Sequence, residues 1–297
     1  MVRHLYLFAV LAVFPLFIQK VYSDQVLTAE KVQNSPIIDG KADDPVWKQG
    51  KEIVTHDKTA NIDITIKALY SDTKIFFLVV FPDPDESRTH KSWAWDKKIE
   101  IYKQGLDRED VFIFKWNLMP YSVDLSIYSD SPYLSDIWFW KACRSDPSGH
   151  ADDKKQQLSE TELPDSKKLT SKSGKIMYLQ RIGDKGTAAY KTTLFTEYQE
   201  GSMPHFESQT PSGSRADVRA KGSWAGGKWV IEFERSLKTG DNDDIQLEPD
   251  KTYQLGVSRY EIAGRLPETE SSQPLFGCGD ISENLKLNFN SKQQKSQ

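Results

Sequence analysis

Cysteine and histidine are scarce in this chain. Only two cysteines, Cys143 and Cys278, occur in 297 residues, which excludes a disulfide scaffold. No Cys-x-x-Cys occurs either, so metal sites built on cysteine pairs and covalently attached c-type haem are excluded. After the first 23 residues no two histidines lie within eight residues of each other, and no zinc or di-iron spacing is visible.

The common sequence signs of several enzyme classes are also missing. There is no Gly-x-Ser-x-Gly, no P-loop and no dinucleotide fingerprint, which removes the usual evidence for hydrolase, nucleotidase or dehydrogenase chemistry. The formal net charge of −4 makes the chain a poor generic binder of nucleic acid. With 38% hydrophobic and 28% charged residues, the composition is that of a globular protein.

Long apolar runs are absent except at the start. Arg3 precedes an apolar run over residues 7–18, and Ser23 precedes Asp24, an order typical of a secretory signal peptide over residues 1–23. An uncleaved N-terminal anchor is the alternative. No later stretch is long enough or free enough of charge to form a transmembrane segment. We therefore expect an exported protein in the periplasm or an equivalent extracytoplasmic compartment, with one domain over 24–290 and a frayed tail over 291–297.

Short strands account for most of the apolar pattern. Residues 62–70 alternate apolar and polar, and residues 75–81 run apolar to Pro82, which predicts a hairpin with a doubly buried second strand. A second hairpin is predicted where Trp224 and Trp229 flank a four-residue turn. Further short strands are predicted at 111–116, 137–140, 230–235, 253–257 and 285–289. No long amphipathic helix is evident, so the predicted fold is all-β, an antiparallel β-sandwich with long loop excursions.

Two polar stretches interrupt this pattern. Residues 151–175 contain almost no apolar side chains and are predicted to form an exposed excursion. Residues 201–215 are rich in Pro, Gly and Ser, which fits a domain boundary or a long sandwich connection, and the hairpins on both sides favour the connection. The acidic pairs at 152–153 and 241–244 would suit calcium, although acidic turns are more often simply solvated.

Residues 136–144 form the most unusual stretch of the sequence. Strand alternation places Trp138 and Trp140 on one face, and Phe139 and Lys141 on the other. Two indoles on one face are able to wall a flat ligand. The alternative is that they simply fill the sandwich core.

Several short motifs together resemble a known family, the haem b-binding domains of the gamma subunits of ethylbenzene dehydrogenase, selenate reductase and nitrite oxidoreductase. The order and spacing of the motifs carry the resemblance, which spans most of the chain after residue 23. The motifs are Ile38-Asp39-Gly40 before Trp47, Ala68-Leu69-Tyr70-Ser71-Asp72 before Phe76-Phe77, Glu109-Asp110 before Lys115-Trp116-Asn117, Asp136 to Ala142, Ala151-Asp152-Asp153, Gly213 to Val218, and Gly227-Lys228-Trp229 running to Gly240.

The resemblance implies a non-catalytic subunit with one non-covalent haem b, held by a methionine and a lysine. Such a subunit relays electrons for a molybdenum oxidoreductase, with its catalytic and iron–sulfur subunits as partners. In this chain the methionine slot falls near Ile127 and the lysine slot near Cys278, and neither residue is the family's ligand. Met119 is then the best remaining candidate for the iron. The predicted cofactor-binding residues are Met119, Trp138, Trp140 and Lys141.

Three functions follow as alternatives. The chain is an exported haem b electron carrier, a haem-free structural or assembly subunit of the same kind of complex, or a carbohydrate-binding module. The resemblance also places Cys143 and Cys278 around the haem pocket, where an oxidising compartment favours a disulfide between them. Two buried, inert thiols are the alternative.

Overall fold

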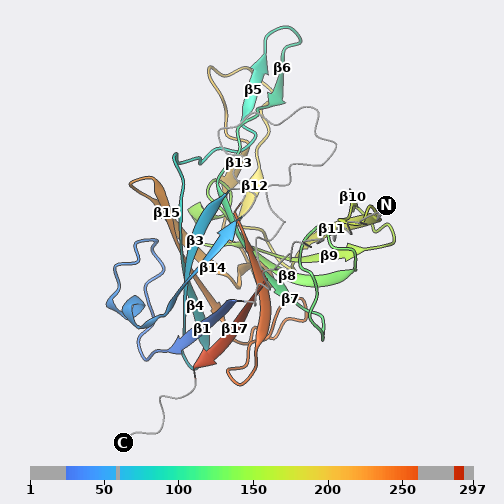
Figure 1. Cartoon of the computed structure of the whole chain (residues 1–297). Helices are drawn as coiled ribbons and strands as arrows, with labels where there is room; N and C mark the ends of the chain where they lie inside the picture. The colour runs from blue at the N-terminus through green and yellow to red at the C-terminus, as the bar shows by residue number, and fades with distance from the viewer. Residues whose placement is uncertain (1–24, 58–60, 260–283, 291–297) are drawn as a thin grey trace, which may run out of the picture.

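A computed structural model describes residues 25–57, 61–259 and 284–290, and their fold is built almost entirely from strands (Figure 1). This part of the chain contains short 3-10 helices but no α-helix. The predicted signal peptide, Cys278 and the predicted tail lie outside the described residues. In chain order the elements are β1 Gln25–Lys31, η1 Pro45–Gln49, β2 Glu52–Asp57, β3 Ile62–Tyr70, β4 Lys74–Pro82, β5 Trp93–Asp96, β6 Ile101–Gln104, β7 Val111–Asn117, β8 Tyr133–Lys141, η2 Asp146–Ser148, β9 Asp152–Ser159, β10 Lys167–Thr170, β11 Ile176–Gly183, β12 Tyr190–Thr192, β13 Phe206–Ser208, η3 Gly213–Ala216, β14 Arg219–Trp224, β15 Lys228–Ser236, β16 Tyr253–Ser258 and β17 Asn284–Asn290.

Most of the strands join one 13-stranded sheet in the order β10-β11-β9-β8-β7-β16-β17-β1-β3-β4-β15-β14, with β2 paired to β3. The two predicted hairpins are confirmed as β3–β4 and β14–β15, and Trp224 lies opposite Trp229 in the second. Pairing is antiparallel except at β1, which runs parallel to both β17 and β3. Strand β1 thereby joins the two halves of the sheet.

The sheet folds over so that its two halves pack face to face. Aromatic rings of β4 and β15 meet rings of β7 and β8, with centroids 4.7 Å apart for Phe77 and Phe114 and 4.8 Å apart for Trp140 and Trp229. Large aromatic side chains bury the most apolar area per residue and dominate such cores. The prediction of an all-β sandwich is confirmed.

Residues 151–175 are only in part the exposed excursion that their composition suggests: most side chains over 160–175 are exposed, but several over 151–159 are buried. They form β9, β10 and the turn into β11. These strands continue the sheet from β8 to one of its edges, in the order β8-β9-β11-β10. Asp152, Asp153 and Gln156 are buried. For residues 151–159 the prediction is wrong because it equates polar with exposed, whereas Asp152 is held in the interior by Lys141 and Arg215.

The segment over 201–215 behaves as a connection. It contains β13 and most of η3, and strands before and after it belong to the same sheet. Strand β13 pairs with β12, and the β5–β6 hairpin projects beyond them at one end of the molecule (Figure 1). Within the described residues, no helix has the length and apolar character needed to cross a membrane.

Candidate functional site

Strand β8 separates two environments, as its alternation predicts. Trp138 and Trp140 are wholly buried between the halves of the sandwich. The Trp138 ring lies 4.9 Å from that of Trp116, and the Trp140 ring packs on Trp229. Both indoles therefore pack against protein side chains, which is the core-filling alternative.

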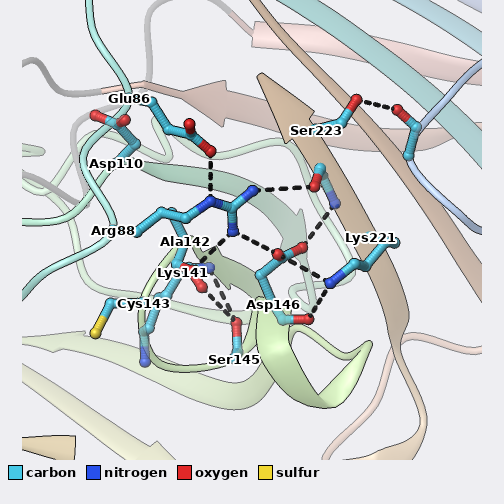
Figure 2. Close-up of polar contacts among 12 residues, drawn as sticks. Glu86, Arg88, Asp110, Lys141, Ala142, Cys143, Ser145, Asp146, Lys221 and Ser223 are labelled. Carbon is cyan, nitrogen blue, oxygen red and sulfur yellow. Dashed lines mark hydrogen bonds and ion pairs between the residues drawn. The ribbon is translucent and has the colours of Figure 1, made fainter. Parts of the chain in front are cut away.

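An aspartate anchors the end of this strand. Both Trp140 Nε1 and the backbone N–H of Gly222 donate to Asp146 Oδ1, at 2.9 and 2.7 Å. Figure 2 shows Arg88 and Lys221 converging on the same carboxylate, where Arg88 Nη1 lies 2.8 Å and Lys221 Nζ 3.2 Å from Oδ2. Glycine is required at position 222 because a Cβ there would lie 2.5 Å from the Trp140 ring. Asp146 thus ties β8 to β14.

The opposite face of β8 carries Lys141, which is buried and paired. Its Nζ contacts the Asp152 carboxylate and lies 3.1 Å from the Tyr190 hydroxyl. Arg215 Nη2 reaches the other oxygen of Asp152 at 2.6 Å. Burial, partly offset by Asp152, lowers the Lys141 pKa to about 8. Burial opposes ionisation of Asp152, but its cationic neighbours outweigh this effect and hold its pKa below the ordinary range.

Beside Lys141 lies a second buried carboxylate, Glu109. It accepts hydrogen bonds from the backbone N–H groups of Cys143 and Arg144, at 2.8 and 3.0 Å, and pairs with the Arg144 side chain. Burial, together with the negative charge of Glu109, raises the pKa of the half-buried Cys143 thiol to about 11. This thiol is therefore a poor nucleophile, and its predicted disulfide with Cys278 stays a prediction.

Met119 packs away from the tryptophan pair. It contacts a small apolar cluster that includes Ile127 and Tyr133. Tyr133 is an odd-numbered residue of β8, so this cluster lies on the face that carries Lys141, opposite Trp138 and Trp140. The expected single pocket bordered by Met119 and the tryptophans is therefore not formed. The haem-contacting roles of these residues stay predictions.

A feature that the sequence reasoning missed is the aromatic arm, which we define as the β5–β6 hairpin, including its turn, and residues 193–203. Trp95 of β5 packs edge-on against Tyr102 of β6 at 5.0 Å and lies 5.4 Å from Tyr198. A cavity of about 270 Å³ opens here. Its lining consists of Trp93, Trp95, Glu100, Ile101, Tyr102, Leu194, Phe195 and Thr196. The closely spaced Trp93 and Trp95 were the available signal, but the strand is only four residues long.

Comparisons with known proteins give one family and a set of distant structures. The family model described as "Ethylbenzene dehydrogenase" matches residues 28–264. No curated protein matches the chain. A family 9 carbohydrate-binding module from Caldicellulosiruptor kristjanssonii, solved with cellotriose, is 10% identical with a TM-score of 0.40, covering 92% of this chain and 97% of the module. The same module with glucose gives 10% identity and a TM-score of 0.39, covering 91% and 97%.

Proposed function

Because this chain belongs to the ethylbenzene dehydrogenase family, as its motifs predict, we propose that it is a non-catalytic accessory subunit of a molybdenum oxidoreductase complex. In this role it binds the partner subunits through the aromatic arm. The complex operates in the extracytoplasmic compartment to which the predicted signal peptide directs the chain.

The exposed apolar surface of the arm carries this proposal. Leu194 is 81% exposed and Tyr198 54%, and Ile99 and Ile101 of the hairpin are also exposed. Ile101 and Leu194 line the same cavity, and apolar surface gathered in this way marks interaction sites. Tryptophan and tyrosine are also the residues that most often dominate protein interfaces.

The arm is held in shape before any partner binds. The Tyr102 hydroxyl accepts a hydrogen bond from the Gln199 backbone N–H at 2.9 Å, and Trp93 Nε1 donates to the Thr193 carbonyl at 3.1 Å. These bonds tie the β5–β6 hairpin to the 193–203 segment. Because the side chains that line the cavity are already ordered, less side-chain conformational entropy is lost on binding. The cavity therefore suits the insertion of an apolar partner side chain.

The described residues at the family's methionine slot do not fit a haem. Ile127 is buried in an apolar cluster and has no atom that coordinates iron. The predicted lysine slot at Cys278 lies outside the described residues. We therefore favour the haem-free structural subunit over the electron carrier.

Haem b binding is kept as a second candidate because of one contact. Met119 packs against the cluster that contains Ile127, which brings a thioether to the side of β8 where the slot lies. A visible spectrum of protein expressed with ample haem decides between the two. A Soret band that changes in Met119→Ala would establish the carrier, whereas protein without a Soret band supports the haem-free subunit.

Molybdenum measurement tests the proposed function. The tagged chain is purified under mild conditions from its native host, and molybdenum is quantified by mass spectrometry against the tag. We expect molybdenum to co-elute in a fixed ratio with the chain. A Trp95→Ala/Tyr198→Ala variant is expected to lose at least roughly 30-fold in retention, as for hot-spot residues. The matched control is Ile182→Ala, an exposed apolar residue of β11.

Each failure has a distinct meaning. Native protein that elutes without molybdenum contradicts the accessory role. An arm variant that retains molybdenum as well as Ile182→Ala contradicts the arm as the docking surface. Equal thermal midpoints for the variants are required so that loss of retention does not reflect unfolding.

A further inference from the structure

A buried group of carboxylates lies where β8, β9 and the segment after β15 meet. It contains Asp136 of β8, Asp153 of β9 and Asp244 from the segment between β15 and β16. One carboxylate oxygen from each lies within 4.8 Å of the others. All three residues are buried. Three chain segments that are distant in sequence thus bring oxygen atoms to one interior point.

Several oxygens of this group lack hydrogen-bond donors. Both carboxylate oxygens of Asp153 and Oδ1 of Asp136 have no hydrogen-bond partner, whereas Asp136 Oδ2 accepts from the Ile245 backbone N–H at 3.0 Å and from Trp138 Nε1 at 3.2 Å. A fourth side chain adds to the group: Asp184 is only 6% exposed, its Oδ2 is also unpartnered, and its carboxyl contacts that of Asp153. Buried polar atoms are nearly always hydrogen-bonded, so several free oxygens at one point indicate a missing ligand.

Charge balance points to a cation. Arg235 lies against the group, with Nη2 2.9 Å from Asp244 Oδ2 and 3.6 Å from Asp136 Oδ2. One guanidinium cannot compensate four buried carboxylates, and burying unpaired charge is strongly unfavourable.

We propose that Asp136, Asp153 and Asp244 bind a structural Ca²⁺ ion, with Asp184 beside them. The ligand set is all carboxylate oxygen with no histidine or cysteine, which suits a hard cation and disfavours zinc. Magnesium retains waters and demands near-octahedral geometry, so a buried group of carboxylates favours calcium.

The surroundings of the carboxylate group indicate how the ion would enter from solvent and which parts of the fold it would join. Asp217 and Asp241 lie within 4.8 Å of Asp244 and are partly exposed, so they continue the acidic group toward solvent. The ion would join β8 and β9, in one half of the sandwich, to the segment that leaves β15 in the other half. The site does not depend on the proposed partner complex.

Calorimetry and thermal unfolding of the chelator-treated full chain test this site, with CaCl₂ as the probe. We expect about one Ca²⁺ per chain and, at a hundredfold excess over Kd, a rise in Tm of roughly 5–10 °C. MgCl₂ at the same concentration is expected to give a smaller rise. Wild-type protein that binds no Ca²⁺ and whose Tm is the same with CaCl₂ and with chelator would overturn the proposal.

The variant Asp153→Asn separates binding from folding. It removes a ligand and one of the crowded buried carboxyl groups together, so the metal-free Tm at pH 7.5 is expected to hold or rise while the Ca²⁺-induced shift disappears. Asp250→Asn, at an exposed position, is the matched control and keeps the full shift. If Asp153→Asn folds and binds Ca²⁺ as tightly as the control, the assignment of these ligands is overturned.

Discussion

At the scale of single residues, the ionisable side chains buried in the interior make the strongest demand on the fold, because each needs a polar partner there. The wholly buried side chains include Arg235 and Lys115 as well as the aromatic residues. Each finds acceptors: Lys115 Nζ donates to the Leu125 carbonyl at 2.9 Å, and Arg235 Nη1 to the Ile245 carbonyl at 2.8 Å. Burial of charge is tolerated only where such partners exist, so these positions are sensitive to substitution.

His90 gives a specific pH dependence. Burial, assisted by Arg144 and other cations, lowers its pKa to about 2, while the charge of nearby Glu109 is already taken up by Arg144. A folded-state pKa below the unfolded value of about 6.5 means that the unfolded chain binds the proton first as pH falls. Stability is therefore lost below pH 6.5, by about 2 kcal/mol between pH 6.5 and 5.0 from this residue alone.

Urea unfolding at these two pH values measures the effect. The variant His90→Gln is expected to lose about 2 kcal/mol less than wild type over the same interval. An identical pH dependence in His90→Gln and wild type would show that this histidine does not titrate as its burial requires.

At the scale of elements, the link between β8 and β14 depends on Asp146. Its carboxylate is buried and accepts from Trp140 and Gly222 while it pairs with Arg88 and Lys221. Asp146→Ala leaves two buried N–H donors unsatisfied and is expected to cost about 3–5 kcal/mol of unfolding free energy. Denaturant unfolding provides the measurement.

A matched salt-bridge variant isolates the effect of burial. Asp72 pairs with Lys31 at 2.7 Å, but its side chain is 83% exposed. Asp72→Ala is therefore expected to cost at most about 1 kcal/mol. Equal losses for the two variants would contradict the anchoring role of Asp146.

The strands that could be predicted from sequence are those with an apolar rhythm. Alternation in β3, and the unbroken apolar run in β4, identified both strands and their hairpin, because each places apolar side chains where the sandwich buries them. Strand β9 escaped this reasoning, since its interior side chains are Asp and Gln whose partners lie elsewhere in the sequence. Composition alone cannot distinguish a solvated polar run from an internally paired one.

The candidate site was predictable only in part for a related reason. Alternation correctly placed Trp138 and Lys141 on opposite faces of β8. It gave no information on what covers each face, so Met119 was expected beside the tryptophans although it packs on the other side. The carboxylate group likewise needs Asp153 and Asp244 side by side, a contact that strand pattern does not encode.

At the scale of the whole molecule, the two ends of the described chain meet inside the sheet. Strands β1 and β17 pair along six residues, between β16 and β3. The arm projects at the other end (Figure 1). The sandwich is therefore closed by contacts of high sequence separation, and cross-links between distant segments would stabilise it most.

The predicted disulfide is such a cross-link. Joining Cys143 to Cys278 would close a loop of about 135 residues and stabilise the fold by on the order of 4 to 5 kcal/mol in the chain-entropy model. That gain would substitute for a missing haem. Thiol counting in denaturant without reductant is expected to find no free thiol. Two free thiols per chain would remove the bridge and weaken the haem-free subunit with it.

Cross-linking mass spectrometry of the native complex tests the central claim most directly. Lys97, Lys98 and Lys103 lie on the arm, whereas Lys168 lies on β10 at the far edge of the sheet. An amine-reactive reagent is expected to join the arm lysines to a subunit of the molybdenum enzyme, while Lys168 gives links only within the chain. Links to the enzyme from Lys168 with none from the arm would contradict docking through the arm. The absence of any link to a molybdenum-containing partner would contradict the accessory role itself.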